Sequence, residues 1–226
     1  MTKEMTNNLK HYKKLAKLFQ YPDDEYPLHV RVVESLLSLL YPETLNTFKE
    51  FADFVYSATC ETLEEIFART FDVQAITTLD IGYVLFGDDY KRGELLVNLN
   101  REHKEADNDC GNELADNLSN LLELLPKMKN DDLRKELIQK ILMPALNKII
   151  NEFNVESIKL KNKVYKKQFK TIIDQSEDYV TIYRKPLLVV YKIIEKDFGY
   201  VKPQQDDNKN SFTDSITSEI KIDKQK

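Results

Sequence analysis

The chain is poor in glycine and cysteine, and both shortages exclude classes of function. Its 226 residues include five glycines, none in a GxGxxG or GxxxxGK arrangement. Loops of those kinds hold nucleotide phosphates on backbone amides, so the phosphate-binding motifs of most nucleotide enzymes are missing. Two isolated cysteines, Cys60 and Cys110, lie outside any CxxC pair, which favours reduced thiols over a disulfide framework or a metal site.

Catalytic and metal-binding patterns are also missing. The three histidines, His11, His29 and His103, are scattered, and no serine or cysteine lies in a nucleophile-elbow context. HExxH does not occur, so the motifs indicate neither a catalytic triad nor a zinc site. We therefore expect no catalytic residue, no metal and no cofactor, with a small helical enzyme whose groups converge from distant positions as the alternative.

Long apolar runs do not occur. No window of about twenty apolar residues is present, so we expect no stable insertion into a membrane. Residues 1–20 contain lysines and no apolar core, which predicts a cytoplasmic protein without a secretory signal. Acidic and basic residues number 38 and 33, and the net charge of −5 disfavours nucleic acid as a general partner.

Strand-like alternation is scarce, whereas apolar residues recur at spacings of three and four, as in Leu133, Leu137, Ile138 and Ile141. This period predicts an all-α fold, a single-domain helical bundle over residues 1–202 followed by a flexible polar tail over 203–226. The predicted helices cover residues 5–20, 24–40, 44–58, 62–70, 74–86, 89–106, 117–127, 131–153, 156–174 and 179–198.

Several residues predict where these helices begin and end. Thr62 and Glu65 have the spacing of a capping box, and Asp72 is placed to cap the helix over 74–86. Asp131 lies before the apolar stripe from Leu133 to Ile150. Pro144 removes a backbone donor, so it should kink or split the helix over 131–153 near Leu142. Gly199 and Pro203 should end the final helix.

One basic run, residues 159–170 (KLKNKVYKKQFK), interleaves lysines with apolar residues. At helical spacing it forms an amphipathic segment, which favours a solvated lysine face over a packed stripe. Contact with an anionic surface or RNA is the alternative.

Residues 86–125, FGDDYKRGELLVNLNREHKEADNDCGNELADNLSNLLELL, carry the most informative motifs. An FGD turn leads into a helix with an Arg-Gly pair, and an E-L-x-D-x-L element follows. The segments LAKLFQYPDDEYP (15–27) and IFARTFD (66–72) precede them. In this order the segments resemble the NarJ/TorD family of molybdoenzyme assembly chaperones, with the nitrate reductase assembly chaperones (NarJ) as the nearest group.

The chain departs from the motifs of both subfamilies. NarJ-like members read L-P-D-Y-L-P where residues 114–119 read LADNLS, so both prolines and the aromatic residue are missing and the hinge should be less rigid. TorD-like members have E-P-x-D-H, of which Glu113 and Asp116 match only the acidic positions. The subfamily therefore stays open.

The resemblance implies a TorD/NarJ-like helical bundle that acts as a cytoplasmic chaperone and not as an enzyme. Its partner would be the N-terminal, signal-like peptide of a molybdenum-enzyme catalytic subunit, such as a nitrate reductase or nitrite oxidoreductase, held during cofactor insertion. A helical scaffold or adaptor without a role in cofactor insertion is the alternative. A monomer is favoured. The peptide-binding residues so implied are Tyr83, Phe86, Asp88, Arg92, Glu113, Asp116 and Leu121, with Gly87, Gly93 and Gly111 as hinge or turn residues.

Each of these assignments has a plainer structural reading. Arg92 follows Asp88 by four residues and Asp89 by three, so it either forms an ion pair at the helix start or organises the FGD turn beside a peptide groove. Tyr83 and Phe86 are three residues apart and also fit a simple core position. Gly93, inside a helix, costs about 1 kcal/mol relative to alanine, which predicts close approach of another helix.

The acidic loop over 102–116 surrounds Gly111 and matches no EF-hand spacing. We interpret it as a flexible acidic hinge that attracts a basic peptide. Charge would then speed the encounter, and apolar burial would hold the complex.

Overall fold

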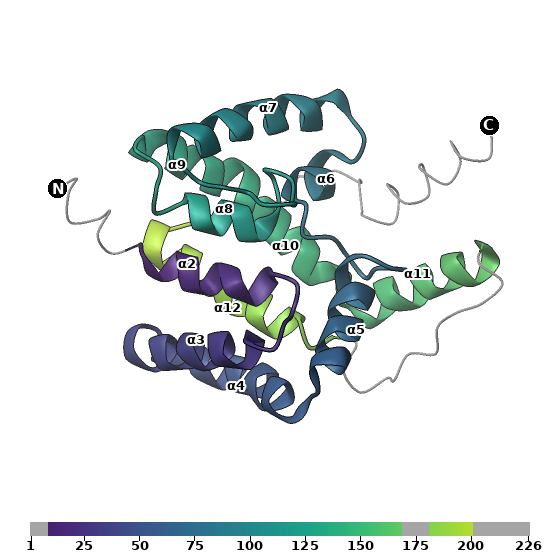
Figure 1. Cartoon of the computed structure of the whole chain (residues 1–226). Coiled ribbons are helices and arrows are strands. Elements are labelled where there is room, and N and C mark those ends of the chain that lie inside the picture. Colours follow the sequence, from purple (N-terminus) through teal and green to yellow (C-terminus); the bar gives the residue numbers. More distant parts are fainter. Residues whose placement is uncertain (1–8, 169–180, 201–226) are drawn as a thin grey trace.

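The computed structural model describes residues 9–168 and 181–200, with backbone alone for 163–168. Within these ranges the secondary structure is helical and contains no strand, which confirms the all-α prediction (Figure 1). The predicted tail over 203–226, Pro203 and Lys170 lie outside the described residues, as do the predicted helix ends beyond Gln168 and before Thr181.

The first half of the chain forms helices α2 to α5. The bounds are α2 (His11–Ala16), which continues as the 3₁₀ turn η1 (Lys17–Phe19), then α3 (Tyr26–Leu40), α4 (Pro42–Ser57) and α5 (Cys60–Phe71). The second half contains α6 (Ile81–Phe86), α7 (Tyr90–Glu105), α8 (Leu118–Leu124), α9 (Asp131–Leu137), the π-helical turn η2 (Ile138–Leu142), α10 (Met143–Glu152), α11 (Val155–Gln168) and α12 (Arg184–Phe198).

The two halves share one hydrophobic core. Helix α12 contacts both α4 and α10, and α2 contacts both α3 and α8, so each half is packed against the other (Figure 1). Fully buried aromatic residues fill the centre, with Phe51, Phe67 and Phe71 around the ring of Tyr183. Burying such rings supplies much of the apolar area that stabilises a helical core.

The segment before α6 differs from the sequence prediction. Helix was expected over 74–86 with Asp72 as its cap, but α6 begins only at Ile81, and Asp72 instead follows the end of α5. The backbone at Asp80 pairs in antiparallel fashion with Asn117. The helical period of 74–86 is thus overridden by pairing with a segment distant in sequence, which a local pattern does not reveal.

One predicted helix start moves by two residues, and another is confirmed with a different cap. Thr59 caps α5, since its Oγ1 accepts the Thr62 N–H at 3.2 Å, so Thr62 lies inside the helix and the predicted capping box is wrong. Asn130 caps α9 and accepts from two backbone N–H groups, which places Asp131 at the first helical position.

Pro144 and Gly199 act as predicted. The long helix is interrupted by the π turn η2, which ends at Leu142, and Pro144 lies in the first turn of α10, where its missing N–H is tolerated. Gly199 ends α12 in the left-handed conformation, with φ of 62°.

Candidate functional site

Two distant segments cross at the start of α6 and form the base of the candidate site. The Ile81 N–H donates to the carbonyl of Asp116 (3.0 Å), and the Leu118 N–H donates to the carbonyl of Leu79 (2.8 Å). These bonds join the E-L-x-D-x-L element to the helix that ends in the FGD turn. The two parts of the motif region therefore form one unit.

Asp116 is the centre of this unit. Its side chain is 0% exposed, and its Oδ2 accepts the Gly82 N–H at 3.0 Å. A carboxylate is favourable beside the free N–H groups of a helix start. A Cβ at Gly82 would lie 2.6 Å from Oδ2, so only glycine permits this approach.

Arg92 holds the unit together from α7. Its Nη2 donates to Asp80 Oδ2 at 3.0 Å, its Nε lies 3.4 Å from Asp116 Oδ2, and its guanidinium lies 5.1 Å from the ring centroid of Tyr83. The predicted ion pair with Asp88 or Asp89 is wrong. Asp88 is exposed, and Asp89 caps α7 through the Lys91 N–H.

Negative charge is in excess in this unit. Asp80 and Asp116 together carry two carboxylates against the single guanidinium of Arg92. Burial raises the pKa of Asp80 above its ordinary value, the charge of Asp116 raises it further, and Arg92 opposes both. The buried Oδ1 of Asp116 has no hydrogen-bond partner among the described residues.

A cleft of about 360 Å³ opens beside this unit. The carboxylates of Asp72, Asp80 and Glu113 line it, and proximity to Glu113, after burial itself, raises the pKa of Asp72. We name it the acidic cleft. Its lining comprises Phe19, Gln20, Tyr21, Phe67, Phe71, Asp72, Thr78, Leu79, Asp80, Cys110, Asn112, Glu113, Asn117, Ser119 and Asn120.

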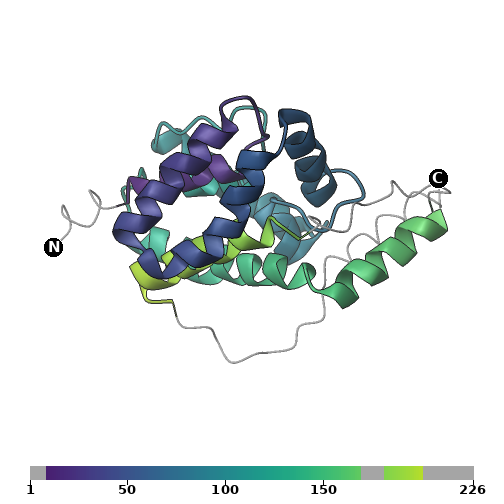
Figure 2. The same cartoon turned by 90° about the horizontal axis from the view of Figure 1, so that it is seen from below.

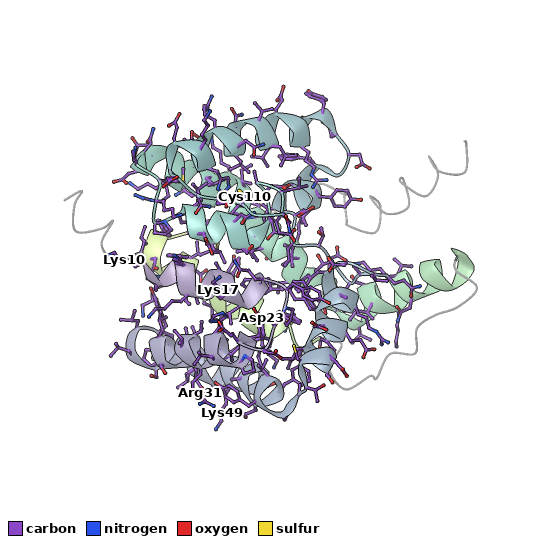
Figure 3. All side chains as sticks on the ribbon, in the orientation of Figure 1. Lys10, Lys17, Asp23, Arg31, Lys49 and Cys110 are labelled. Carbon is purple, nitrogen blue, oxygen red and sulfur yellow. The ribbon has the colours of Figure 1, made fainter. Side chains whose placement is uncertain are left out.

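Aromatic rings form one wall of the acidic cleft. The ring centroids of Tyr21 and Phe67 lie 5.5 Å apart in an edge-to-face arrangement, and Phe67 contacts Phe71 at 5.0 Å. Cys110 also lines the cleft and lies near α8 (Figure 3). The Asn120 side chain donates to its carbonyl. Burial and the charge of Asp109 raise the pKa of its thiol, which disfavours a reactive thiolate.

The sequence-predicted site residues do not all reach this cleft. Glu113 lines it and also accepts the Asn117 side-chain amide at 3.3 Å. Asp116 and Leu121 are 0% exposed and Tyr83 is 8% exposed, so the expectation that Asp116 faces a ligand outside the core is corrected. Phe86 and Arg92 are half-buried.

The predicted hinge glycines have different roles. Gly87 and Gly111 adopt positive φ values of 59° and 60°, which favour glycine in both turns. A Cβ at Gly93 would meet nothing within 4 Å, so the predicted close approach of another helix is wrong there. The glycine that other atoms do approach closely is Gly82, which the sequence did not indicate.

Sequence reasoning also missed most of the cleft lining. Asp80, Tyr21, Phe67, Phe71 and Asp72 were not assigned to a site. The sequence did point to four of these residues. Tyr21 lies in the YPDDEYP segment, and Phe67, Phe71 and Asp72 belong to IFARTFD. All the quoted motif segments contribute to the acidic cleft or to the buried unit beside it.

A second, apolar groove of about 380 Å³ lies between α7 and the α9–η2 region. Leu95, Leu99, Met128, Leu133 and Ile141 are among its lining residues. None of the predicted site residues lines it.

Among the described residues, no group of three or more His, Cys, Asp or Glu side chains is arranged to hold a metal ion. Within the same ranges, no helix has the length and apolar character needed to cross a membrane. No protein-family model matches the chain. No curated protein matches it either.

Proposed function

We propose that the protein is a cytoplasmic chaperone, specific to one system, that binds the N-terminal segment of a molybdenum-enzyme catalytic subunit of the nitrate reductase or nitrite oxidoreductase kind. It holds this segment while the cofactor is inserted and then releases it. The observation that supports this proposal is the convergence of the motif segments on one cleft. The segments that resemble the chaperones include LAKLFQYPDDEYP, IFARTFD and the region of the E-L-x-D-x-L element. Residues from all three line the same acidic cleft.

The chemistry of the acidic cleft fits a basic side chain. Carboxylates at Asp72, Asp80 and Glu113 attract a cation, and a guanidinium can form paired hydrogen bonds with them. An exposed face of the Tyr21 or Phe67 ring attracts a cationic side chain. Signal-like N-terminal peptides place basic residues beside an apolar stretch, so both halves of such a peptide find a matching surface.

The size of the cleft limits what enters it. A volume of about 360 Å³ accepts one or two side chains and not a whole helix. The remaining peptide lies on the surface, and ordering it costs about 2 to 5 kcal/mol of the interaction energy. Affinity in the micromolar range is therefore sufficient, and it permits release of the client.

The test is calorimetry with a synthetic peptide covering the N-terminus of a molybdoenzyme catalytic subunit from the same organism. Binding should show a negative heat-capacity change, because apolar surface is buried. Glu113→Gln should weaken binding about fivefold by removing one charge contact of about 1 kcal/mol. The matched control is Glu105→Gln, an exposed residue outside the cleft lining, which should bind as the native protein does.

Two results would count against the proposal. If Glu113→Gln and Glu105→Gln bind the peptide equally, the acidic cleft is not the binding site. If the peptide binds but the enzyme made without this protein contains its full complement of molybdenum, the protein is an adaptor without a role in cofactor insertion.

A further inference from the structure

Helix α11 projects from the body of the molecule. In both views it extends beyond α10 and α5, away from the bundle (Figures 1 and 2). Of its described side chains, Val155 and Leu160 are 65% and 52% exposed. Single exposed apolar residues are common on protein surfaces, so these two matter through their position beside the lysines of the helix.

One side of α11 is tied to the body through Lys161. This lysine is 3% exposed, its Nζ lies 2.8 Å from Glu152 Oε2, and it donates to the carbonyl of Ile76. The expectation that the basic run has only solvated lysines is therefore wrong at Lys161. The contact fixes which side of α11 faces inward.

The other lysine positions of α11 share the opposite side. At about 100° per residue, positions 159, 163, 166 and 167 fall within an arc of roughly 100°, centred nearly opposite position 161. We name these four positions the lysine face. Glu156, the one acidic residue of the helix, falls within the same arc in the first turn of α11. The exposed Val155 and Leu160 fall at the two edges of the arc.

We propose that the lysine face of α11 docks the protein on a membrane surface of anionic phospholipids. A basic helix face bordered by exposed aliphatic residues matches the composition of helices that lie on such surfaces. The docking is peripheral, since α11 is short and strongly charged.

Nucleic acid is the competing anionic partner, and the residues disfavour it. Single-stranded RNA is held by aromatic stacking and by arginine, but α11 contains no arginine. Its one aromatic residue, Tyr165, falls on the same side of the helix as Lys161 by register. Aliphatic residues at the edges of the lysine face have no role in contacting phosphates alone, whereas they can enter the headgroup region of a lipid surface. This inference depends on α11 and not on the proposed chaperone function.

The test is co-sedimentation of the full chain with vesicles made of equal parts phosphatidylcholine and phosphatidylglycerol. The chain should bind these vesicles, bind phosphatidylcholine vesicles far less, and dissociate as salt is added. The variant K159Q/K163Q/K166Q/K167Q should lose binding by at least about a hundredfold, since each lysine near such a surface contributes roughly a fivefold factor.

The matched control is K13Q/K14Q/K49Q/K135Q, which removes four exposed lysines from other helices and leaves the same net charge. It should bind nearly as the native chain does, and circular dichroism should show equal helical content in both variants. Leu160→Gln should weaken vesicle binding several-fold. Equal loss in both quadruple variants, or binding of a single-stranded RNA as tight as vesicle binding and unaffected by Leu160→Gln, would overturn the proposal.

Discussion

At the scale of single residues, the packing around Asp116 requires that position 82 carries no side chain, as glycine provides. Asp116 is fully buried, bonds the start of α6, and contacts Arg92, and this arrangement leaves no space for a side chain at position 82. Gly82 and Gly93 are both helical, yet only Gly82 is enclosed by other atoms. The two glycines therefore make a direct test of the packing.

We predict that Gly82→Ala lowers the free energy of unfolding by about 1 to 3 kcal/mol, because the new Cβ collides with the buried carboxylate. Gly93→Ala should instead raise it by up to about 1 kcal/mol, since alanine is the better helix former and the site is open. Urea denaturation followed by circular dichroism measures both. Equal effects in the two variants would show that Gly82 is not tightly enclosed.

A second residue-scale prediction concerns Asp72. Burial and Glu113 raise its pKa above the ordinary value of 3.8, so its contribution to stability is full below that value and is lost as the pH rises through its raised pKa. Asp72→Asn should therefore raise the melting temperature near neutral pH. The gain should shrink as the pH falls towards 3.8. A gain that is constant with pH would contradict the link to this carboxyl group.

The sign of that effect bears on function. Asp72 follows the C-terminal end of α5, where negative charge is unfavourable, and its carboxylate reduces stability at neutral pH. This cost is explained if the acidic cleft needs the charge of Asp72 for binding. The same variant should then bind the client peptide more weakly. Stability and affinity would change in opposite directions.

At the scale of secondary structure elements, the sequence predicted most of the helices, and the helices that it placed wrongly have identifiable physical causes. Helices α3, α4, α5, α7 and α12 follow apolar periods and lie within a few residues of their predicted bounds, except for the start of α12. The residues before α6 have a helical period too, but their backbone pairs with a segment about 35 residues away. Local propensity cannot anticipate such pairing.

The candidate site was harder to predict for the same reason. Arg92 has acidic neighbours on its own helix, but it pairs with carboxylates that only the crossing of two segments brings near. The motif segments indicated which regions matter, and the structure shows which of their side chains face the cleft. Leu121 illustrates the limit, because a leucine in a helix is more often a core residue than a ligand contact, and Leu121 is fully buried.

The contact between α11 and the segment before α6 gives an element-scale prediction. Lys161→Met should lower the free energy of unfolding by about 3 to 5 kcal/mol, because it leaves the buried carboxylate of Glu152 without its partner. The double variant E152M/K161M should recover most of this loss, since no unpaired charge is buried. A double-mutant cycle measures the coupling. Additive losses would show that the two side chains are independent.

At the scale of the whole molecule, contacts far apart in sequence join the ends of the described chain. Asp197 on α12 accepts hydrogen bonds from Tyr12 (3.0 Å) and Tyr41 (2.8 Å) and lies 3.0 Å from His11 Nε2. Helix α12 therefore closes the core against the first helices. A fold with such distant contacts forms as one cooperative unit.

The residues that pack around the acidic cleft come later in the sequence than the residues that line it, and this order matters during protein synthesis. Every lining residue has been made once Asn120 is translated. Lys161, which donates to the carbonyl of Ile76 in the segment between the lining residues Asp72 and Thr78, and Tyr183, whose ring contacts Phe67 and Phe71, come later. At about 5 to 20 residues per second, the ribosome needs on the order of several seconds to add them. During that interval the nascent chain carries the cleft residues without the packing that positions them. If the acidic cleft binds a peptide as proposed, we expect this binding only from a chain translated past Tyr183.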